Sequence, residues 1–206
     1  MTEDPFKELR GQPYDLYIAP APYSFDLNQD MVDMIRDEFN ADAVLGMLAE
    51  AVGDKTGDEA TAAAEALFAQ TGEKWMRKTI QLGEEYSDRT IEVVMETVNR
   101  KGEQFIIFPH VPQRFVEIAY LSTQEFMKVP IVLNNMNDFA YKIPQCALFN
   151  KIKEKSGEEV ANLMTCKNYC LTALDTIKNH MDLDVLIDQQ ASTPADGFCQ
   201  FSMKKL

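Results

Sequence analysis

Four cysteines are the residues of this chain with the most distinctive chemistry, and all of them lie in its last third: Cys146, Cys166, Cys170 and Cys199. A thiolate can act as a nucleophile or bind a metal ion, whereas a neutral thiol packs as a small apolar side chain. Cys166 and Cys170 are four residues apart in a helical pattern and share one helix face. Because the other two lie on different predicted elements, only tertiary structure can bring the four together.

The four cysteines leave several kinds of site open. Zinc takes four Cys or His ligands at structural sites and three plus water at catalytic sites. All four cysteines would therefore form a closed site for zinc or another transition metal, and three would form an open one. Their spacings of 20, 4 and 29 residues match no zinc-finger or ferredoxin pattern. A nucleophilic thiol, a redox pair and simple packing in the core remain as alternatives.

Cys146 is the candidate nucleophile, because it follows an extended stretch and directly precedes a predicted helix. The partial positive charge at a helix N-terminus favours the thiolate form of a cysteine. His110 is the candidate general base if its loop, between Pro109 and Pro112, folds over the cysteines; the alternative is a histidine on a surface loop. His180 ends a predicted helix, where a cation interacts well with the helix dipole.

Further polar and aromatic residues are candidates for ligand contacts. Asn135, Asn137 and Tyr141 alternate along a predicted strand over residues 131–143, and they supply polar groups to a small ligand in this interpretation. A solvent-facing strand edge is the alternative for the asparagines. Trp75 is expected in the core, where its indole N–H needs a hydrogen-bond partner.

Composition limits the classes of function. The net charge of -13 argues against a nucleic-acid partner and against an anionic membrane surface. No uncharged apolar stretch of membrane-spanning length occurs, and the acidic N-terminus has no apolar signal segment. We therefore expect a cytoplasmic protein with reduced thiols. Phosphate-loop and dinucleotide-binding motifs are absent from the sequence, so no nucleotide cofactor is predicted.

The pattern of apolar residues predicts an N-terminal arm over residues 1–28 and a single α+β domain over residues 29–206. Residues 29–102 are predicted to be helical, with an interruption at Thr71-Gly72, and residues 103–206 to be mixed sheet and helix. In the second part we predict a short strand or hairpin edge at 105–108, a strand at 131–143, a long helix at 158–180 and two terminal strands at 184–190 and 198–203. Residues 113–128 are ambiguous between helix and strand. Consecutive terminal strands favour an antiparallel sheet.

Several short motifs give the chain a resemblance to a known family. They are Pro144-Gln145-Cys146, Cys166 with Cys170, Gly197-Phe198-Cys199-Gln200-Phe201, and Trp75 followed by Leu82-Gly83-Glu84-Glu85. In their order they resemble the L-2-amino-thiazoline-4-carboxylic acid hydrolase family, which is similar to vinyl-4-reductase-like domains. The resemblance implies a vinyl-4-reductase-like fold and a cysteine- or metal-dependent hydrolase of a small cyclic amidine or amide. The alternative that it implies is a non-catalytic module that binds a small molecule or a metal.

Two features favour a homodimer. The segment over residues 5–25 is rich in Pro and Tyr, and its aromatic side chains must cover this domain or a second copy. The predicted helix over residues 60–69 is rich in Ala, which permits close contact between helices.

Overall fold

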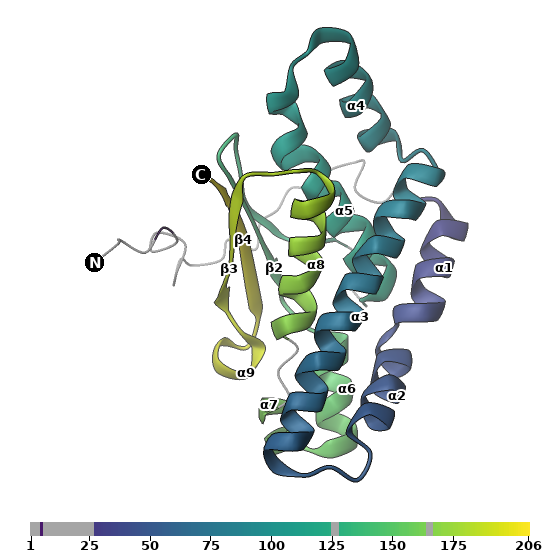
Figure 1. Ribbon diagram of the computed structural model, residues 1–206, viewed down its shortest axis with the longest axis vertical. Helices are drawn as coiled ribbons and strands as arrows, with labels where there is room; N and C mark the ends of the chain where they lie inside the picture. Colours follow the sequence, from purple (N-terminus) through teal and green to yellow (C-terminus); the bar gives the residue numbers. More distant parts are fainter. Residues whose placement is uncertain (1–4, 6–26, 125–127, 164–166) are drawn as a thin grey trace.

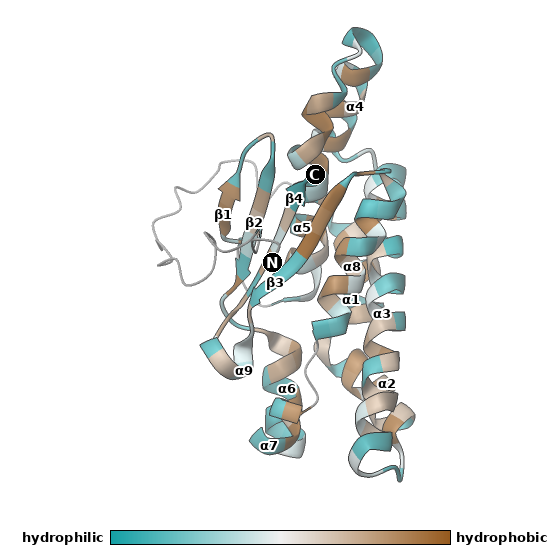
Figure 2. Cartoon of the chain, turned by 60° about the vertical axis from the view of Figure 1, so that its left-hand side comes forward, coloured by the Kyte–Doolittle hydropathy of each residue, from teal (hydrophilic) through white to brown (hydrophobic). Residues whose placement is uncertain are grey.

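Helices cover one face of a four-stranded antiparallel sheet (Figure 1). The computed structural model describes residue 5 and residues 27–124, 128–163 and 167–206. Figure 2, turned by 60°, shows the same two layers, with α3 and α8 on the helical side of the sheet. The predicted α+β class, with a helical first half and an antiparallel sheet, is confirmed.

The first half of the domain consists of helices, and side chains cap the start of three of them. It contains α1 (Gln29–Phe39), α2 (Ala41–Val52), α3 (Gly57–Glu85) and α4 (Arg89–Lys101). The side chains of Asn28, Asn40 and Asp88 accept hydrogen bonds from backbone N–H groups in the first turns of α1, α2 and α4. These caps satisfy donors that the helix itself leaves unpaired.

The second half alternates helices with the strands of the sheet. The helices are η1 (Gln104–Ile106), α5 (Ile107–Thr123), α6 (Ala147–Ser156), α7 (Glu158–Leu163), α8 (Lys167–His180) and α9 (Thr193–Asp196). The strands are β1 (Ile131–Asn134), β2 (Asp138–Ile143), β3 (Val185–Ala191) and β4 (Cys199–Lys205), in the spatial order β1-β2-β4-β3.

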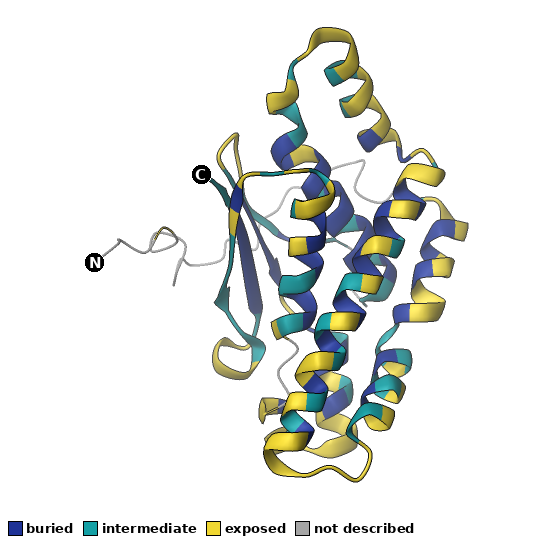
Figure 3. Cartoon of the chain, in the orientation of Figure 1, coloured by how far each residue is buried: buried dark blue, intermediate teal, exposed yellow. Residues whose placement is uncertain are grey.

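The register of β2 against β4 separates an apolar face of the sheet from a polar one. Phe139 pairs with Met203, Tyr141 with Phe201 and Ile143 with Cys199, and all six are buried in the core. The intervening positions are mostly polar: Lys204 forms an ion pair with Asp138 at 3.1 Å, and Ser202 donates a hydrogen bond to Gln190 at 2.7 Å. Figure 3 shows buried residues along β4 and along the sides of α5 and α8. The core therefore lies between the sheet and these helices.

The predicted interruption at Thr71-Gly72 is wrong, because α3 runs through it without a break. Gly72 has a different role: a Cβ atom at this position would lie 2.2 Å from the carbonyl oxygen of Tyr169 in α8. The glycine is needed for the close approach of two helices. From the sequence alone, a glycine inside a helical pattern is interpreted as a helix breaker, because the sequence does not show its packing partner.

Two other segments also differ from the predictions, and a third is covered only in part by the described residues. Residues 105–108 form η1 and the start of α5 rather than a strand, and the ambiguous segment up to residue 123 is helical. The predicted strand over 131–143 is a hairpin, because the Asn135 side chain accepts hydrogen bonds from the N–H groups of Asn137 and Asp138 and closes a turn. The predicted helix over 158–180 corresponds to α7 and α8, with residues 164–166 outside the described part.

None of the helices in the described ranges combines the length and apolar character that crossing a membrane requires. Part of the Ala-rich face of α3 is used within the chain, since Ala60 and Ala64 are buried. Most of the predicted N-terminal arm falls outside the described residues. The homodimer stays a prediction.

Candidate functional site

Three of the four cysteines line one small cavity. Cys146 precedes α6, Cys170 lies in the first turn of α8 and Cys199 begins β4; all three are buried. The cavity has a volume of about 20 Å³ and is completed by the partly buried Gln124 and by six core residues: Trp75, Tyr120, Ile143, Leu148, Tyr169 and Phe201. None of the three cysteines forms a disulfide. Cys166 lies outside the described residues.

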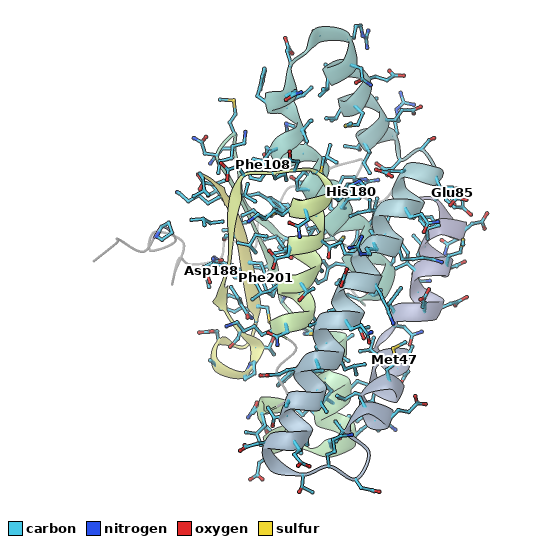
Figure 4. All side chains as sticks on the ribbon, viewed as in Figure 1. Met47, Glu85, Phe108, His180, Asp188 and Phe201 are labelled. Atoms are coloured by element: carbon cyan, nitrogen blue, oxygen red, sulfur yellow. The ribbon has the colours of Figure 1, made fainter. Side chains whose placement is uncertain are left out.

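A larger groove of about 260 Å³ adjoins this cavity. It is lined by Phe149, Lys167, the last residues of β3 from Gln189 on, and the β3–β4 connection from Ser192 to Pro194, together with Asp196. Cys170, Cys199 and Phe201 line both spaces and so form the wall between them. Phe201, labelled in Figure 4, reaches from β4 toward α8. The two thiols of this wall are within reach of anything that occupies the groove.

The local structure around Cys146 matches the prediction that it precedes a helix. Strand β2 ends at Ile143, and Cys146 is the N-cap of α6, whose Phe149 N–H lies 3.4 Å from the sulfur and donates to it. The Ala147 N–H donates to Gln124 at 2.8 Å. Because an N–H group and the positive end of a helix both face the sulfur, this position favours a negatively charged thiolate.

The other two thiols are in a different electrostatic environment. Burial raises the pKa of Cys170 well above its ordinary value, and the nearby Cys199 and Cys146 add to the effect. Burial also raises the pKa of Cys199, although hydrogen bonding with Thr193 opposes the increase. The Cys199 sulfur lies 3.4 Å from the Thr193 N–H and 3.1 Å from its hydroxyl. Both residues are therefore neutral thiols at neutral pH.

We expect the stability of the protein to fall as the pH rises above the ordinary thiol pKa of roughly 8.5. The folded-state pKa of Cys170 is raised, so the unfolded chain loses this proton first and gains from the higher pH. The free energy of unfolding, measured in urea from pH 7.5 to 10, should decline less steeply for Cys170→Ala than for the wild type. Parallel slopes would show that Cys170 ionises normally in the fold.

Aromatic rings hold the inner wall of the cavity. Trp75 is fully buried, edge-on to Tyr120 at 5.1 Å and tilted over Tyr169 at 4.9 Å between ring centroids. The Tyr120 hydroxyl lies 3.4 Å from that of Tyr141, and burial raises the pKa of both phenols well above the ordinary value. Trp75 Nε1 has no hydrogen-bond partner within the described part of the chain. The indole is thus fixed in place with its donor unused.

The structure does not bring the other predicted site residues to this cavity. His110 is exposed in the first turn of α5 and lines neither space; Phe108, two residues earlier, lies at the far end of the sheet from α9 (Figure 4). Asn135 and Asn137 belong to the exposed β1–β2 turn, whereas Tyr141 is buried in the core. His180 bonds Glu84 at 2.9 Å at the end of α8.

Several residues of the two spaces carry no signal in the sequence. Tyr120 lies in the segment that is ambiguous between helix and strand, and Tyr169 lies on a helix without any motif around it. Lys167 and Thr193 line the same groove as Cys199, although they lie far apart in the sequence. In the sequence, only Cys199 at the start of the last strand indicates that the segment between β3 and β4 could belong to a site.

The cysteines of the described ranges do not meet the geometry of a metal site. Within these ranges, no three His, Cys, Asp or Glu side chains are arranged so that they could hold one metal ion. The predicted set of Cys146, Cys166, Cys170 and Cys199 also includes a residue that lies outside them. The arrangement that the structure does show is three cysteines and a tryptophan among the residues that line a small apolar cavity.

Comparison of the chain with protein-family models, with curated proteins and with solved structures finds no match.

Proposed function

We propose that the groove and the cavity bind a small molecule and that Cys146 is the nucleophile in the hydrolysis of a small cyclic amide or amidine. The observation that carries this proposal is the convergence of three cysteines, from three separate elements, on one cavity beside a groove. The resemblance to the L-2-amino-thiazoline-4-carboxylic acid hydrolase family supports the same reaction class. A vinyl-4-reductase-like fold and a cytoplasmic location belong to the proposal.

The reaction can be written with Cys146 alone as the covalent group. Its thiolate adds to the amide or amidine carbon, and the C=O or C=N electron pair moves onto the oxygen or nitrogen. When that pair returns, the ring C–N bond breaks and the ring nitrogen takes up the proton that the thiol gave up. Water then adds to the thioester or thioimidate and releases the ring-opened product, which regenerates the thiol.

Replacement of Cys146 by serine is expected to reduce turnover at least about 100-fold, because a serine hydroxyl does not ionise at this position as a thiol does. Turnover would be measured with L-2-amino-thiazoline-4-carboxylate and with cyclic amides of similar size. His110→Gln is the matched comparison, and we expect its rate to equal that of the wild type because His110 lines neither space. Equal turnover by the Cys146→Ser variant would rule out the covalent mechanism.

A non-catalytic binding module is the second candidate, and the environment of Cys170 and Cys199 favours it. Burial keeps both thiols neutral, so they offer an apolar, polarisable wall rather than reactive groups. Calorimetric binding of the same compounds without turnover would support this function. If this module binds a metal ion, Cys166 would have to join the three cysteines of the cavity. Elemental analysis of the purified protein and of its cysteine variants tests that form directly.

A further inference from the structure

We propose that the ligand carries a neutral hydrogen-bond acceptor, such as the carbonyl oxygen of a lactam, and that Trp75 Nε1–H donates a hydrogen bond to this atom in the inner cavity. The inference rests on the proposed function and narrows its substrate class. It selects cyclic amides over cyclic amidines, which are protonated at neutral pH.

The first argument is the unused donor. Trp75 is fully buried, and its Nε1 is the one buried side-chain nitrogen or oxygen in the described part of the chain that has no partner. Leaving such a group unsatisfied costs about 1–3 kcal/mol. An indole nitrogen can only donate. Because Trp75 also lines the cavity, we infer that an acceptor atom bound there satisfies this donor.

The second argument is the size of the two spaces. The cavity of about 20 Å³ exceeds the roughly 10–15 Å³ that a water-sized group needs, so it accommodates one acceptor atom but not a ring. The groove of about 260 Å³ has room for the ring. Only the wall of Cys170, Cys199 and Phe201 is shared, and a cysteine side chain can turn aside by rotation about a single bond. The acceptor atom then points inward while the ring stays in the groove.

The third argument is that, apart from the nucleophilic Cys146 thiolate, the described residues lining the cavity offer no negative charge to compensate a cation. No Asp or Glu lines the cavity among the residues described. The Gln124 side-chain oxygen already accepts the Ala147 N–H, and the Tyr120 and Tyr141 hydroxyls lie close enough to bond each other. A protonated amidine offers only donors, so its N–H would meet the N–H of Trp75. A buried donor that faces another donor is destabilising for both.

This arrangement also bears on the reaction itself. When Cys146 adds to a lactam carbonyl, negative charge develops on the oxygen that Trp75 Nε1–H contacts. A donor aimed at the atom where charge develops contributes more to the transition state than to the bound substrate. Trp75 is then a substrate-contacting residue that determines specificity.

A matched pair of probes tests the inference: 2-pyrrolidinone, a lactam, and 2-iminopyrrolidinium, an amidinium of the same shape. Trp75 is the only tryptophan of the chain, so the indole N–H gives a single cross-peak in a ¹H–¹⁵N spectrum. We expect 2-pyrrolidinone to shift this peak downfield in a saturable manner, and 2-iminopyrrolidinium to leave it in place. An unmoved indole peak with the lactam, or an equal shift with both probes, would overturn the inference.

The Trp75→Phe variant provides the complementary measurement. It keeps an aromatic ring against Tyr120 and Tyr169 but removes the donor, so the Kd of 2-pyrrolidinone should rise about tenfold. If this variant folds poorly, the wild-type spectra recorded with the two probes still test the inference. Shifts of the Lys167 and Thr193 amides without any indole shift would show binding in the groove with a different contact, which overturns this inference and leaves the proposed function standing. Loss of turnover in Cys146→Ser tests the proposed function separately.

Discussion

Replacement of Gly72 by alanine is expected to destabilise the protein by about 3 kcal/mol, the upper end of the usual cost of overpacking a core. The added Cβ atom would lie 2.2 Å from the Tyr169 carbonyl oxygen and 2.9 Å from its carbonyl carbon. Both are backbone atoms, so no side-chain rotation can relieve the contact. Helix α8 would have to move away from α3, and the cavity residues Tyr169 and Cys170 would move with it.

Urea unfolding followed by circular dichroism measures this effect. Gly46→Ala is the matched control, because Gly46 also lies inside a helix but a Cβ atom there would meet nothing within 4 Å. That substitution should stabilise the protein by up to about 1 kcal/mol, since alanine is the better helix former. If both variants are as stable as the wild type, α3 and α8 do not approach each other as closely as the structure has them.

Replacement of Asp88 by alanine is the second change with a large expected effect. Its carboxylate caps α4 through the N–H groups of Thr90 and Ile91 and pairs with Arg114, whose Nη2 lies 2.9 Å from Oδ2. Both side chains are almost fully buried. Removing one partner of a buried ion pair typically costs about 3–5 kcal/mol, because the other charge is left without full compensation. Glu117, 3.0 Å from Arg114, compensates part of it.

Two further variants separate the contributions of Asp88. Asp88→Asn keeps a helix-capping acceptor and removes only the charge, so it should be less destabilising than Asp88→Ala. Glu73→Gln removes one partner of the exposed Arg77–Glu73 pair, and it should change the free energy of unfolding by less than about 1 kcal/mol. Equal losses for Asp88→Ala and Glu73→Gln in urea would show that the pair around Arg114 contributes no more than a surface pair.

The sequence predicts the elements of this fold better than it predicts how they meet. The end of β2, the start of α6 at Cys146 and the last strand from Cys199 all follow from local patterns. The β1–β2 turn does not follow from the sequence pattern, because in a continuous strand Asn135 falls on the same face as the apolar residues Leu133 and Phe139. Gly72 was misread because its partner, the backbone of Tyr169, is almost a hundred residues away in the chain.

The candidate site, like the fold, follows from the sequence only in part. Cysteines are rare enough to attract attention, and three of the four do line one cavity. Trp75 could be predicted as buried, but its lack of a partner depends on the positions of Tyr120 and Tyr169. The imidazole of His110 is suited to act as a general base, but the path of α5 places it away from the cavity. Residue type identifies candidates, whereas tertiary contacts decide which of them share a site.

Tyr169 and Cys170 are consecutive residues, and this adjacency links two properties of the molecule. The backbone of Tyr169 rests on Gly72, its ring covers Trp75, and the next side chain forms the wall of the groove. A ligand that turns Cys170 aside therefore acts on the same helical turn that sets the distance between α3 and α8. Ligand binding and stability are therefore linked in both directions. If a looser contact between α3 and α8 weakens ligand binding, a ligand bound in the groove stabilises that contact by the same free energy and raises the melting temperature.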